Sequence, residues 1–187
     1  MTADRLQLAV IIGSVRAGRI APAVAGWFGM QLDQHDEFSP DVIDLAGLSL
    51  PDCLDGTGDA AVFAKRLEAA DGVVILTPEY NHGYPGALKT AIDTAREEWQ
   101  AKPVGFVSYG GIAGGLRAVE QLRLVFAELH AVTVRQVVSL HWVHDMFEGN
   151  GMLTDHRAPA AAHKMLEQLA WWARALRNAR AEEAYDA

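Results

Sequence analysis

The sequence has little cysteine: Cys53 is the only one among 187 residues. One cysteine excludes an internal disulfide framework and a metal site built from several thiolates, and it suits a reducing compartment. No apolar run is long enough to span a bilayer, and the residues after Met1 carry no cleavage pattern of a secretory signal. We therefore expect a cytoplasmic protein with no membrane partner.

Positive charge is also scarce. Lysine and arginine together number 16, against 24 aspartates and glutamates, which gives a formal net charge of -8. Binding to nucleic acid or to anionic membranes needs a broad basic face, so this balance argues against both partners. Half of the residues are hydrophobic, which is typical of a globular protein. The length predicts a single domain covering residues 1–187.

An apolar run from Leu6 ends in a loop that departs locally from the acidic balance. Residues 13–19 read Gly-Ser-Val-Arg-Ala-Gly-Arg, and an apolar helical pattern follows them. A strand that delivers such a loop to a helix N-terminus directs backbone N–H groups and the positive end of the helix dipole at one point. Ser14, Arg16 and Arg19 add a hydroxyl and two guanidinium groups. The pattern predicts an anion site; the alternative is a solvated turn with two surface arginines.

This anion loop, residues 13–19, departs from two familiar phosphate motifs. It lacks the G-x-G-x-x-G of dinucleotide-binding folds and the Gly-Lys-Ser/Thr ending of a nucleotide P-loop. It also has no cysteine that could serve as a phosphatase nucleophile. Asp44, farther along the chain, could hold a dinucleotide ribose, but without the glycine motif we interpret it as a turn residue. The sequence thus predicts a site that binds a phosphate monoester without cleaving it.

Strand and helix patterns alternate along the rest of the chain. After the strand that follows Leu6, the predicted strands cover residues 41–45, 72–76, 104–109 and 132–140. The predicted helices cover residues 20–32, 60–70, 85–96, about 116–126 and 159–180, with an irregular segment at 141–155. Because right-handed crossovers place helices on both faces of a sheet, the alternation predicts an α/β fold with five parallel strands.

Three loops follow predicted strands: the anion loop, residues 77–86 and residues 108–115. In a parallel sheet, ligands bind beyond the carboxyl ends of the strands, where the strand order reverses. We expect the three loops to meet at that edge. Together they would form a phosphate site flanked by two loops that could hold a flat ring.

The loops carry motifs in a fixed order. The first is Gly13-Ser14-x-Arg16-x-Gly18-Arg19, the second runs from Pro78 to Lys89 as PEYNHGYPGALK with Ile92-Asp93, and the third is Lys102-Pro103-Val104, Ser108, Gly110-Gly111 and Gly114-Gly115-x-Arg117. Over about residues 6–134 the chain resembles the NADPH-dependent FMN reductases, a family that includes quinone, azo-dye and chromate reductases. The resemblance implies a flavodoxin-like three-layer sandwich with strand order 2-1-3-4-5.

The resemblance also implies an oxidoreductase with FMN as cofactor and NADPH or NADH as reductant. Hydride would pass from the nicotinamide to FMN and then to a small acceptor such as a quinone, free flavin or azo dye. The cofactor would perform the chemistry, so no side chain is expected to act as a catalytic nucleophile. The implied residues at the FMN phosphate are Ser14, Arg16, Arg19 and Ile20. Those implied at the edge and pyrimidine side of the flavin ring are Pro78, Glu79, Tyr80, Asn81, Ser108, Tyr109, Gly110 and Gly111.

Two other functions stay open. An FMN-binding electron carrier without nicotinamide oxidation usually shields its flavin between aromatic side chains, whereas Gly83, Gly110 and Gly111 leave room beside the ring. A flavin-free domain could use the anion loop for another phosphate ligand.

The second loop has three side chains of open role: Tyr80, His82 and Tyr84. They would either line the acceptor pocket and donate protons or simply pack within their loop.

Three features bear on partners. Gly83 and Thr94 stand where many relatives carry a serine and an aromatic residue, which leaves the acceptor undetermined. His141 and His144 suggest a metal pair, but too few further ligands lie nearby, so we expect no metal.

Trp171 and Trp172 point in different directions on one helix, which predicts a subunit contact for at least one of them. The resemblance implies a homodimer or homotetramer; the alternative is a packed monomer surface.

Overall fold

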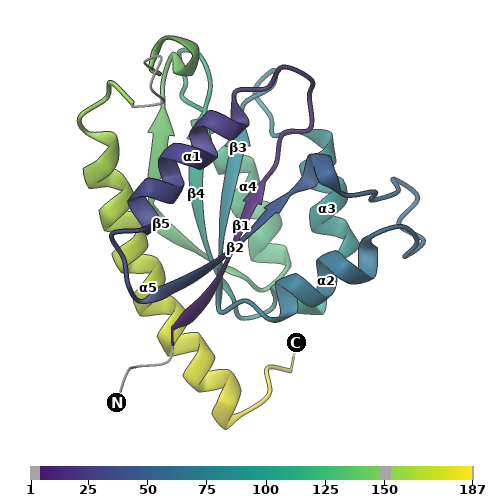
Figure 1. Cartoon of the computed structure of the whole chain (residues 1–187). Coiled ribbons are helices and arrows are strands. Elements are labelled where there is room, and N and C mark those ends of the chain that lie inside the picture. Colours follow the sequence, from purple (N-terminus) through teal and green to yellow (C-terminus); the bar gives the residue numbers. More distant parts are fainter. Residues whose placement is uncertain (1–4, 148–152, 187) are drawn as a thin grey trace.

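The computed structural model describes residues 5–147 and 153–186. Five parallel strands form one sheet in the order β2-β1-β3-β4-β5, which confirms the predicted order (Figure 1). The strands are β1 (Leu6–Ile12), β2 (Phe38–Asp44), β3 (Gly72–Pro78), β4 (Pro103–Tyr109) and β5 (Val132–Leu140).

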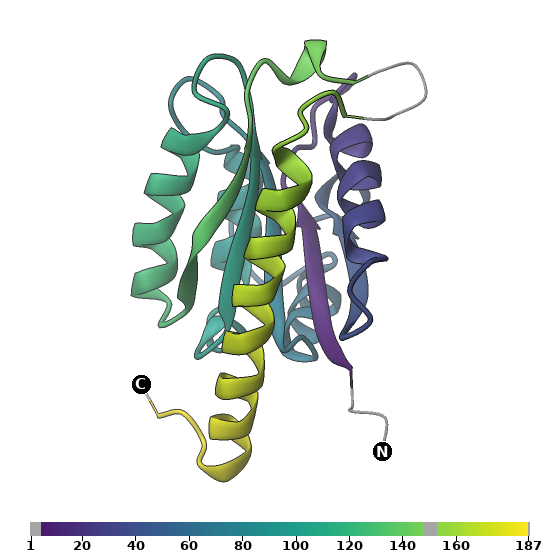
Figure 2. The same ribbon diagram turned by 90° about the vertical axis from the view of Figure 1, so that its left-hand side faces the viewer.

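Helices cover both faces of this sheet. They are α1 (Ala21–Leu32), α2 (Ala60–Glu68), α3 (Gly86–Thr94), α4 (Leu116–Glu128) and α5 (Ala158–Glu182). α1 and α5 pack on one face, and α2, α3 and α4 pack on the other (Figure 2). This is the predicted flavodoxin-like three-layer sandwich. Within the two described ranges, no helix is long and apolar enough to cross a membrane.

The position of each strand in the sheet explains its residue pattern. β3 and β4 lie at the centre and every residue in them is buried, because helices cover both of their faces. Along β1 the side chains alternate: Leu8 and Val10 face α1 and α5, while Ala9 and Ile11 face the other helix layer. An unbroken apolar run is therefore the expected signature of a central strand here.

The edge strand β2 begins earlier than the predicted residues 41–45. Its first residue, Phe38, pairs with Leu6, and the strand passes through Pro40 before reaching Asp41. Proline lacks an N–H donor, but an edge strand has one side without a partner and tolerates it. Asp44 ends the strand, and its carboxylate accepts a hydrogen bond from the Ala46 amide, which confirms its interpretation as a turn residue.

Two other predicted segments differ in detail. α3 begins at Gly86 with Pro85 as its N-cap and ends at Thr94. The predicted irregular segment 141–155 contains a short 3-10 turn, η3 (Val143–Asp145), and residues 148–152 of that segment lie outside the described part of the chain.

Lys102 fastens the end of α2 to the start of β4. Its side chain is buried, and Nζ donates hydrogen bonds to the carbonyl oxygens of Leu67, Glu68 and Ala70 at 2.7, 2.8 and 2.6 Å. The last carbonyls of a helix have no partner within the helix and must find one elsewhere. One ammonium group thus gives a charged donor to three carbonyls, of which that of Leu67 also accepts from the Ala70 amide at 3.1 Å.

Replacing Lys102 with methionine is expected to lower the free energy of unfolding by about 1 to 3 kcal/mol, because the buried carbonyls lose a charged donor. Urea unfolding at neutral pH would measure the change. Lys65→Met is the matched control, since Lys65 lies on the exposed face of α2. An equal loss in both variants would contradict a capping role for Lys102.

Candidate functional site

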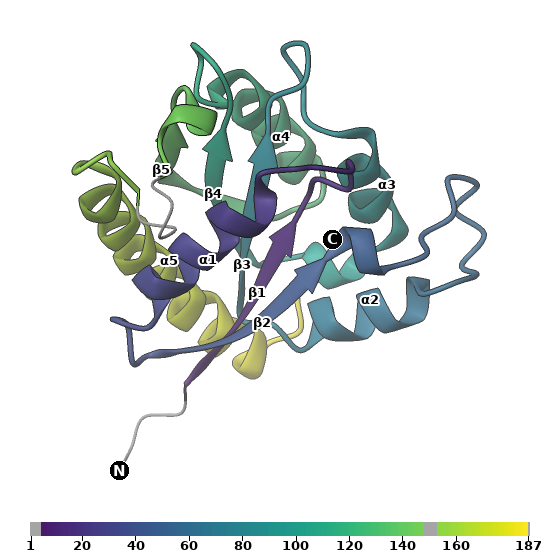
Figure 3. The ribbon, with the colours of Figure 1, turned by 45° about the horizontal axis from the view of Figure 1, so that its top comes forward.

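The loops after β1, β3, β4 and β5 meet at one edge of the sheet, at the top of Figure 1 and toward the viewer in Figure 3. A pocket of about 190 Å³ opens there. It is lined by Ser14, Arg16, Arg19, Ile20, Pro78, Glu79, Tyr80, Tyr109, Gly110, Gly111, Val143 and His144. Ten of these twelve residues are among those predicted from the sequence; Asn81 and Ser108 are the predicted residues that do not line it.

Two roomier cavities, of about 350 and 430 Å³, lie at the opposite end of the sheet. They are lined by residues near the starts of the strands and by the ends of α2 and α5, and they contain none of the predicted site residues. Ligands of parallel α/β sheets bind at the carboxyl ends of the strands. The smaller pocket is therefore the candidate site.

The anion loop leaves β1 and delivers the chain to α1. Gly13 continues the sheet by donating its N–H to the Leu76 carbonyl at 2.9 Å, and a Cβ at this position would lie 3.2 Å from that oxygen. α1 then starts with Ile20 as its N-cap, without a side-chain cap and without an acidic residue in its first turn. Pro22 has no N–H and that of Ala23 donates to the Ile20 carbonyl, so the N–H groups of Ile20 and Ala21 and the positive dipole end are left to face an anion.

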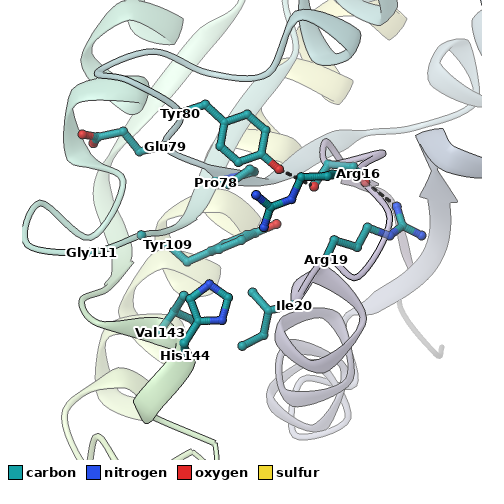
Figure 4. Close-up of a pocket in the computed structure, with 12 residues that line it drawn as sticks. Arg16, Arg19, Ile20, Pro78, Glu79, Tyr80, Tyr109, Gly111, Val143 and His144 are labelled. Carbon is teal, nitrogen blue, oxygen red and sulfur yellow. Dashed lines mark hydrogen bonds between the residues drawn. The ribbon is translucent and has the colours of Figure 1, made fainter.

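Arg19 is paired within the protein. Its guanidinium donates to both carboxylate oxygens of Asp44, at 2.7 and 2.5 Å. It also donates to the carbonyl of Ser14, a bond that Figure 4 shows. The pair ties the anion loop to the end of β2, and Asp44 neutralises the charge of Arg19. Burial alone would raise the pKa of Asp44, but the hydrogen bonds from Arg19 and the Ala46 amide outweigh it and hold the pKa below its ordinary value.

The ion pair predicts a pH dependence of stability. A carboxyl with a lower pKa in the folded than in the unfolded state contributes fully above about pH 4, the unfolded value, and less as pH falls through the folded value. Because the Asp44 side chain is 37% exposed, solvent screening limits the contribution to about 1 kcal/mol. Asp44→Asn should therefore be less stable than the wild type at pH 7, with a difference that vanishes in acid.

Denaturant unfolding across this pH range would measure that difference. Asp36→Asn is the control, because Asp36 is fully exposed and 3.7 Å from Arg5. A stability difference between wild type and Asp44→Asn that grows on acidification would contradict the ion pair.

Arg16 differs from Arg19 in its surroundings. It is exposed, and among the described residues no carboxylate lies within 4.0 Å of its guanidinium. Its guanidinium carbon lies 5.6 Å from the ring centroid of Tyr80, within reach of a cation–π contact. The Tyr80 hydroxyl is in turn 2.8 Å from Ser14 Oγ. Arg16 is thus the guanidinium of this loop that can pair with a ligand anion.

A tight turn from Tyr80 to Gly83 forms the facing side of the pocket. The two residues exchange backbone hydrogen bonds of 2.8 and 3.0 Å. The central residues, Asn81 and His82, have φ angles of 50° and 69°, as a type I′ turn requires. This turn places Asn81 on the surface, which explains why it is not a lining residue.

Glu79 and Ser108 hold the pocket together. Glu79 accepts hydrogen bonds from the Arg117 guanidinium at 2.9 Å and from the Arg117 amide at 3.2 Å. Its carboxylate thus occupies the N-terminus of α4. Ser108 is fully buried, and its hydroxyl contacts the carbonyl oxygens of Gly114 at 2.8 Å and Val138 at 3.3 Å. These carboxylate and hydroxyl groups fix the loop after β4 and do not face a ligand.

Val143 and His144 line the pocket but were not predicted. They reach it because the chain after β5 runs beside the loop after β4: Trp142 donates its N–H to the Gly111 carbonyl at 3.0 Å, and Val143 donates to Gly110 at 3.1 Å. The resemblance becomes loose after residue 134, so no family motif covers Val143 and His144.

The contacts of His141, one of the two histidines considered as a metal pair, lie within the protein. His141 contacts the Ile112 carbonyl through Nδ1 at 2.8 Å and Ser139 Oγ through Nε2 at 3.2 Å. In the part of the chain that the structure describes, no three His, Cys, Asp or Glu side chains are placed to hold a metal ion. Both ring nitrogens of His141 thus serve loop packing.

Tyr109 forms the floor of the pocket. Its side chain is 3% exposed, and its hydroxyl has no hydrogen-bond partner among residues 5–147 and 153–186. Figure 4 shows the hydroxyl pointing toward the loop that carries Arg16. Burial, with a smaller effect of Tyr80, raises the pKa of Tyr109 far above its ordinary value. The phenol therefore stays protonated and is a hydrogen-bond donor at neutral pH.

The sequence model of the family described as NADPH-dependent FMN reductase matches residues 6–145. The chain belongs to this family. Its relatives include the 2-hydroxy-1,4-benzoquinone reductase of Burkholderia sp., 30% identical over 181 residues that cover 90% of this chain and 97% of that protein. The NAD(P)H-dependent FMN reductase C4B3.06c of Schizosaccharomyces pombe is 38% identical over 120 residues, which are 58% of this chain and 60% of that protein's length.

Among solved structures, the flavoenzyme NAD(P)H:(acceptor) oxidoreductase FerB of Paracoccus denitrificans superimposes with a TM-score of 0.75. It is 21% identical, and the match covers 91% of this chain and 98% of that one. This likeness supports the flavodoxin-like fold. Membership of the FMN reductase family confirms the predicted oxidoreductase class, with FMN as cofactor and NADPH or NADH as reductant.

The pocket of this family member fits the phosphate of FMN. A phosphate monoester presents only acceptor oxygens and negative charge. The pocket offers the Arg16 guanidinium, the uncapped N-terminus of α1 and the buried hydroxyl of Tyr109, all of which are donors. Gly110 and Gly111 add a part of the wall without side chains.

Proposed function

We propose that the protein transfers hydride equivalents from NADPH or NADH to a small acceptor through bound FMN. The observation that carries the proposal is the convergence of the anion loop with two further loops in one pocket. FMN, when bound, supplies the hydride chemistry, and the protein positions it. Family membership and the donor set of the pocket support this activity.

In this proposal the residues of the anion loop have different roles. Arg16, Ser14 and the N–H groups at Ile20 bind the FMN phosphate, while Arg19 orients the loop through Asp44. Charge-assisted hydrogen bonds of this kind are shorter and stronger than neutral ones. The charge on Arg16 is thus the main side-chain attraction for the cofactor.

In this proposal the loops after β3 and β4 lie along the flavin ring. The proposed contacts are the backbone of Pro78, Glu79, Tyr80 and Asn81 along one edge, and that of Ser108, Tyr109, Gly110 and Gly111 along the pyrimidine side. N–H donors near the pyrimidine would stabilise the negative charge of the reduced ring. The absence of side chains at Gly110 and Gly111 leaves space for the nicotinamide and then for the acceptor.

We propose a quinone as the class of acceptor. A relative matched over 90% of this chain is named 2-hydroxy-1,4-benzoquinone reductase. A flat quinone also suits a pocket with one glycine wall and an aromatic side chain, Tyr80, on the facing side. Free flavin and azo dyes are the other acceptors to be compared.

An absorbance spectrum of protein reconstituted with FMN, before and after anaerobic addition of NADPH or NADH, tests the activity. Bleaching of the bound flavin, followed by recovery when a quinone is added, is the expected result. Bound flavin that neither nicotinamide bleaches would favour an electron carrier. A protein that binds no FMN would overturn the proposal.

We further propose that the protein is a cytoplasmic homodimer or homotetramer in which each subunit is a single FMN-binding domain. The indole of Trp171 on α5 is 60% exposed, and it packs edge-to-face against Trp172 with ring centroids 5.0 Å apart. Exposed tryptophan is enriched at protein interfaces because it buries a large apolar surface. Sedimentation of the wild type and of Trp171→Glu would test this contact.

A further inference from the structure

In the protein without a ligand, the hydroxyl of Tyr109 is buried and has no hydrogen-bond partner. Burying a hydroxyl without a hydrogen-bond partner costs free energy, so nearly all buried polar atoms in proteins are paired. Tyr109 Oη is the buried side-chain polar atom without a partner among residues 5–147 and 153–186. The side chain lines the candidate pocket, so a ligand there is the natural partner.

The backbone and the hydroxyl of Tyr109 lie at different parts of the pocket. Tyr109 ends β4, and its backbone lies beside Gly110 on the side where the pyrimidine of the flavin was expected. The ring, however, crosses the floor of the pocket, and its hydroxyl points to the loop of Arg16 (Figure 4). The Ser14 hydroxyl approaches that of Tyr109 closely enough to lower its pKa but without the geometry of a hydrogen bond, and Arg19 and Asp44 also influence its titration. The hydroxyl therefore shares the end of the pocket that binds the anion.

The other polar groups at this end show which ligand atom it meets. Arg19 is bonded to Asp44, and the Ser14 hydroxyl, 2.8 Å from that of Tyr80, can donate to a ligand when it accepts from Tyr80. Arg16 and the first turn of α1 remain as donors, and the protonated phenol is a further donor. A ligand group that meets only donors must consist of acceptors, which a phosphate does and a ribityl hydroxyl does not.

We propose that Tyr109 donates its hydroxyl hydrogen to a phosphate oxygen of FMN, and that this bond helps the protein distinguish FMN from riboflavin. The proposal rests on the proposed function, because it requires FMN in this pocket. Tyr109 is a binding residue in this proposal and takes no part in hydride transfer. Its phenol is unpaired in the free protein and paired in the complex.

The test compares wild type and Tyr109→Phe, which keeps the aromatic ring and removes only the hydroxyl. FMN and riboflavin are titrated separately into the apoprotein, with flavin fluorescence as the readout. We expect about tenfold weaker FMN binding in the variant and no change for riboflavin, since one hydrogen bond to a charged group is lost. The melting temperature of the apoprotein should stay equal or rise, because an unpaired hydroxyl is removed.

Tyr185→Phe is the matched control. Tyr185 lies near the C-terminus, is exposed and bonds to His130, away from the pocket. Equal weakening of FMN and riboflavin would place the hydroxyl at the ring or ribityl chain, and unchanged binding of both would make it structural; either result overturns the proposal. Wild type that binds neither flavin would instead overturn the proposed function, and this proposal with it.

Discussion

Replacing Arg16 with alanine is expected to weaken FMN binding about ten- to a hundredfold. Within the described residues this guanidinium has no carboxylate partner, so its charge is available to the phosphate. Hydrogen bonds to charged groups contribute about 1.5 to 3 kcal/mol, which corresponds to this range of affinity. Fluorescence titration of the apoprotein with FMN measures the loss directly.

Two comparisons make the Arg16 result specific. Arg135→Ala removes an exposed arginine on β5 outside the pocket, so it should leave FMN affinity unchanged. Arg16→Lys keeps a positive charge but loses the planar fork, so we expect an intermediate affinity. If Arg16→Ala bound FMN as tightly as the wild type, Arg16 would be removed from the phosphate site.

Replacing Gly115 with alanine is expected to destabilise the protein strongly and to distort the pocket. Gly115 is the N-cap of α4 and has a φ angle of 84°, a left-handed conformation that alanine adopts at a cost. An added Cβ would lie 2.6 Å from the Ser108 Cβ and 2.7 Å from the Tyr109 amide. Backbone strain and overpacking together suggest a loss of about 2 to 6 kcal/mol.

Urea unfolding of this variant has a control within the same chain. Gly29 lies inside α1, and a Cβ there would meet nothing within 4 Å. Gly29→Ala should therefore stabilise the protein by about 0.5 to 1 kcal/mol, the usual preference of a helix interior for alanine. If the two substitutions had the same effect, the close contact between Gly115 and β4 would not be important for stability.

Much of the fold was predictable because the central strands are buried on both faces. Their apolar runs and the helical patterns between them determine the sandwich, and the bounds of β5 agree with those predicted. The start of β2 was missed because Ser39 and Pro40 do not favour a strand. They belong to it because Phe38 pairs with Leu6, a contact between distant residues that local pattern does not contain.

The pocket was predictable to the extent that its residues lie in motifs directly after strands. Ser14, Arg16 and Tyr80 satisfy this condition, and the structure brings them together. The pairing of Arg19 with Asp44 was not predicted, although the sequence contained both residues. They are 25 positions apart, and only the parallel pairing of β1 with β2 makes them neighbours. The motif therefore identified two arginines, and the fold decides which one is free for a ligand.

The backbone bonds from Trp142 and Val143 to Gly111 and Gly110 also determine how the pocket could change its width. They join the chain after β5 to the loop after β4, and His141 adds a further link, so these two segments have to move as one body. The facing turn, Tyr80 to Gly83, closes on itself. A bulky acceptor would therefore meet a stiff wall on one side, and the facing turn is itself held to α4, because the Gln121 side chain donates to the His82 carbonyl at 2.9 Å.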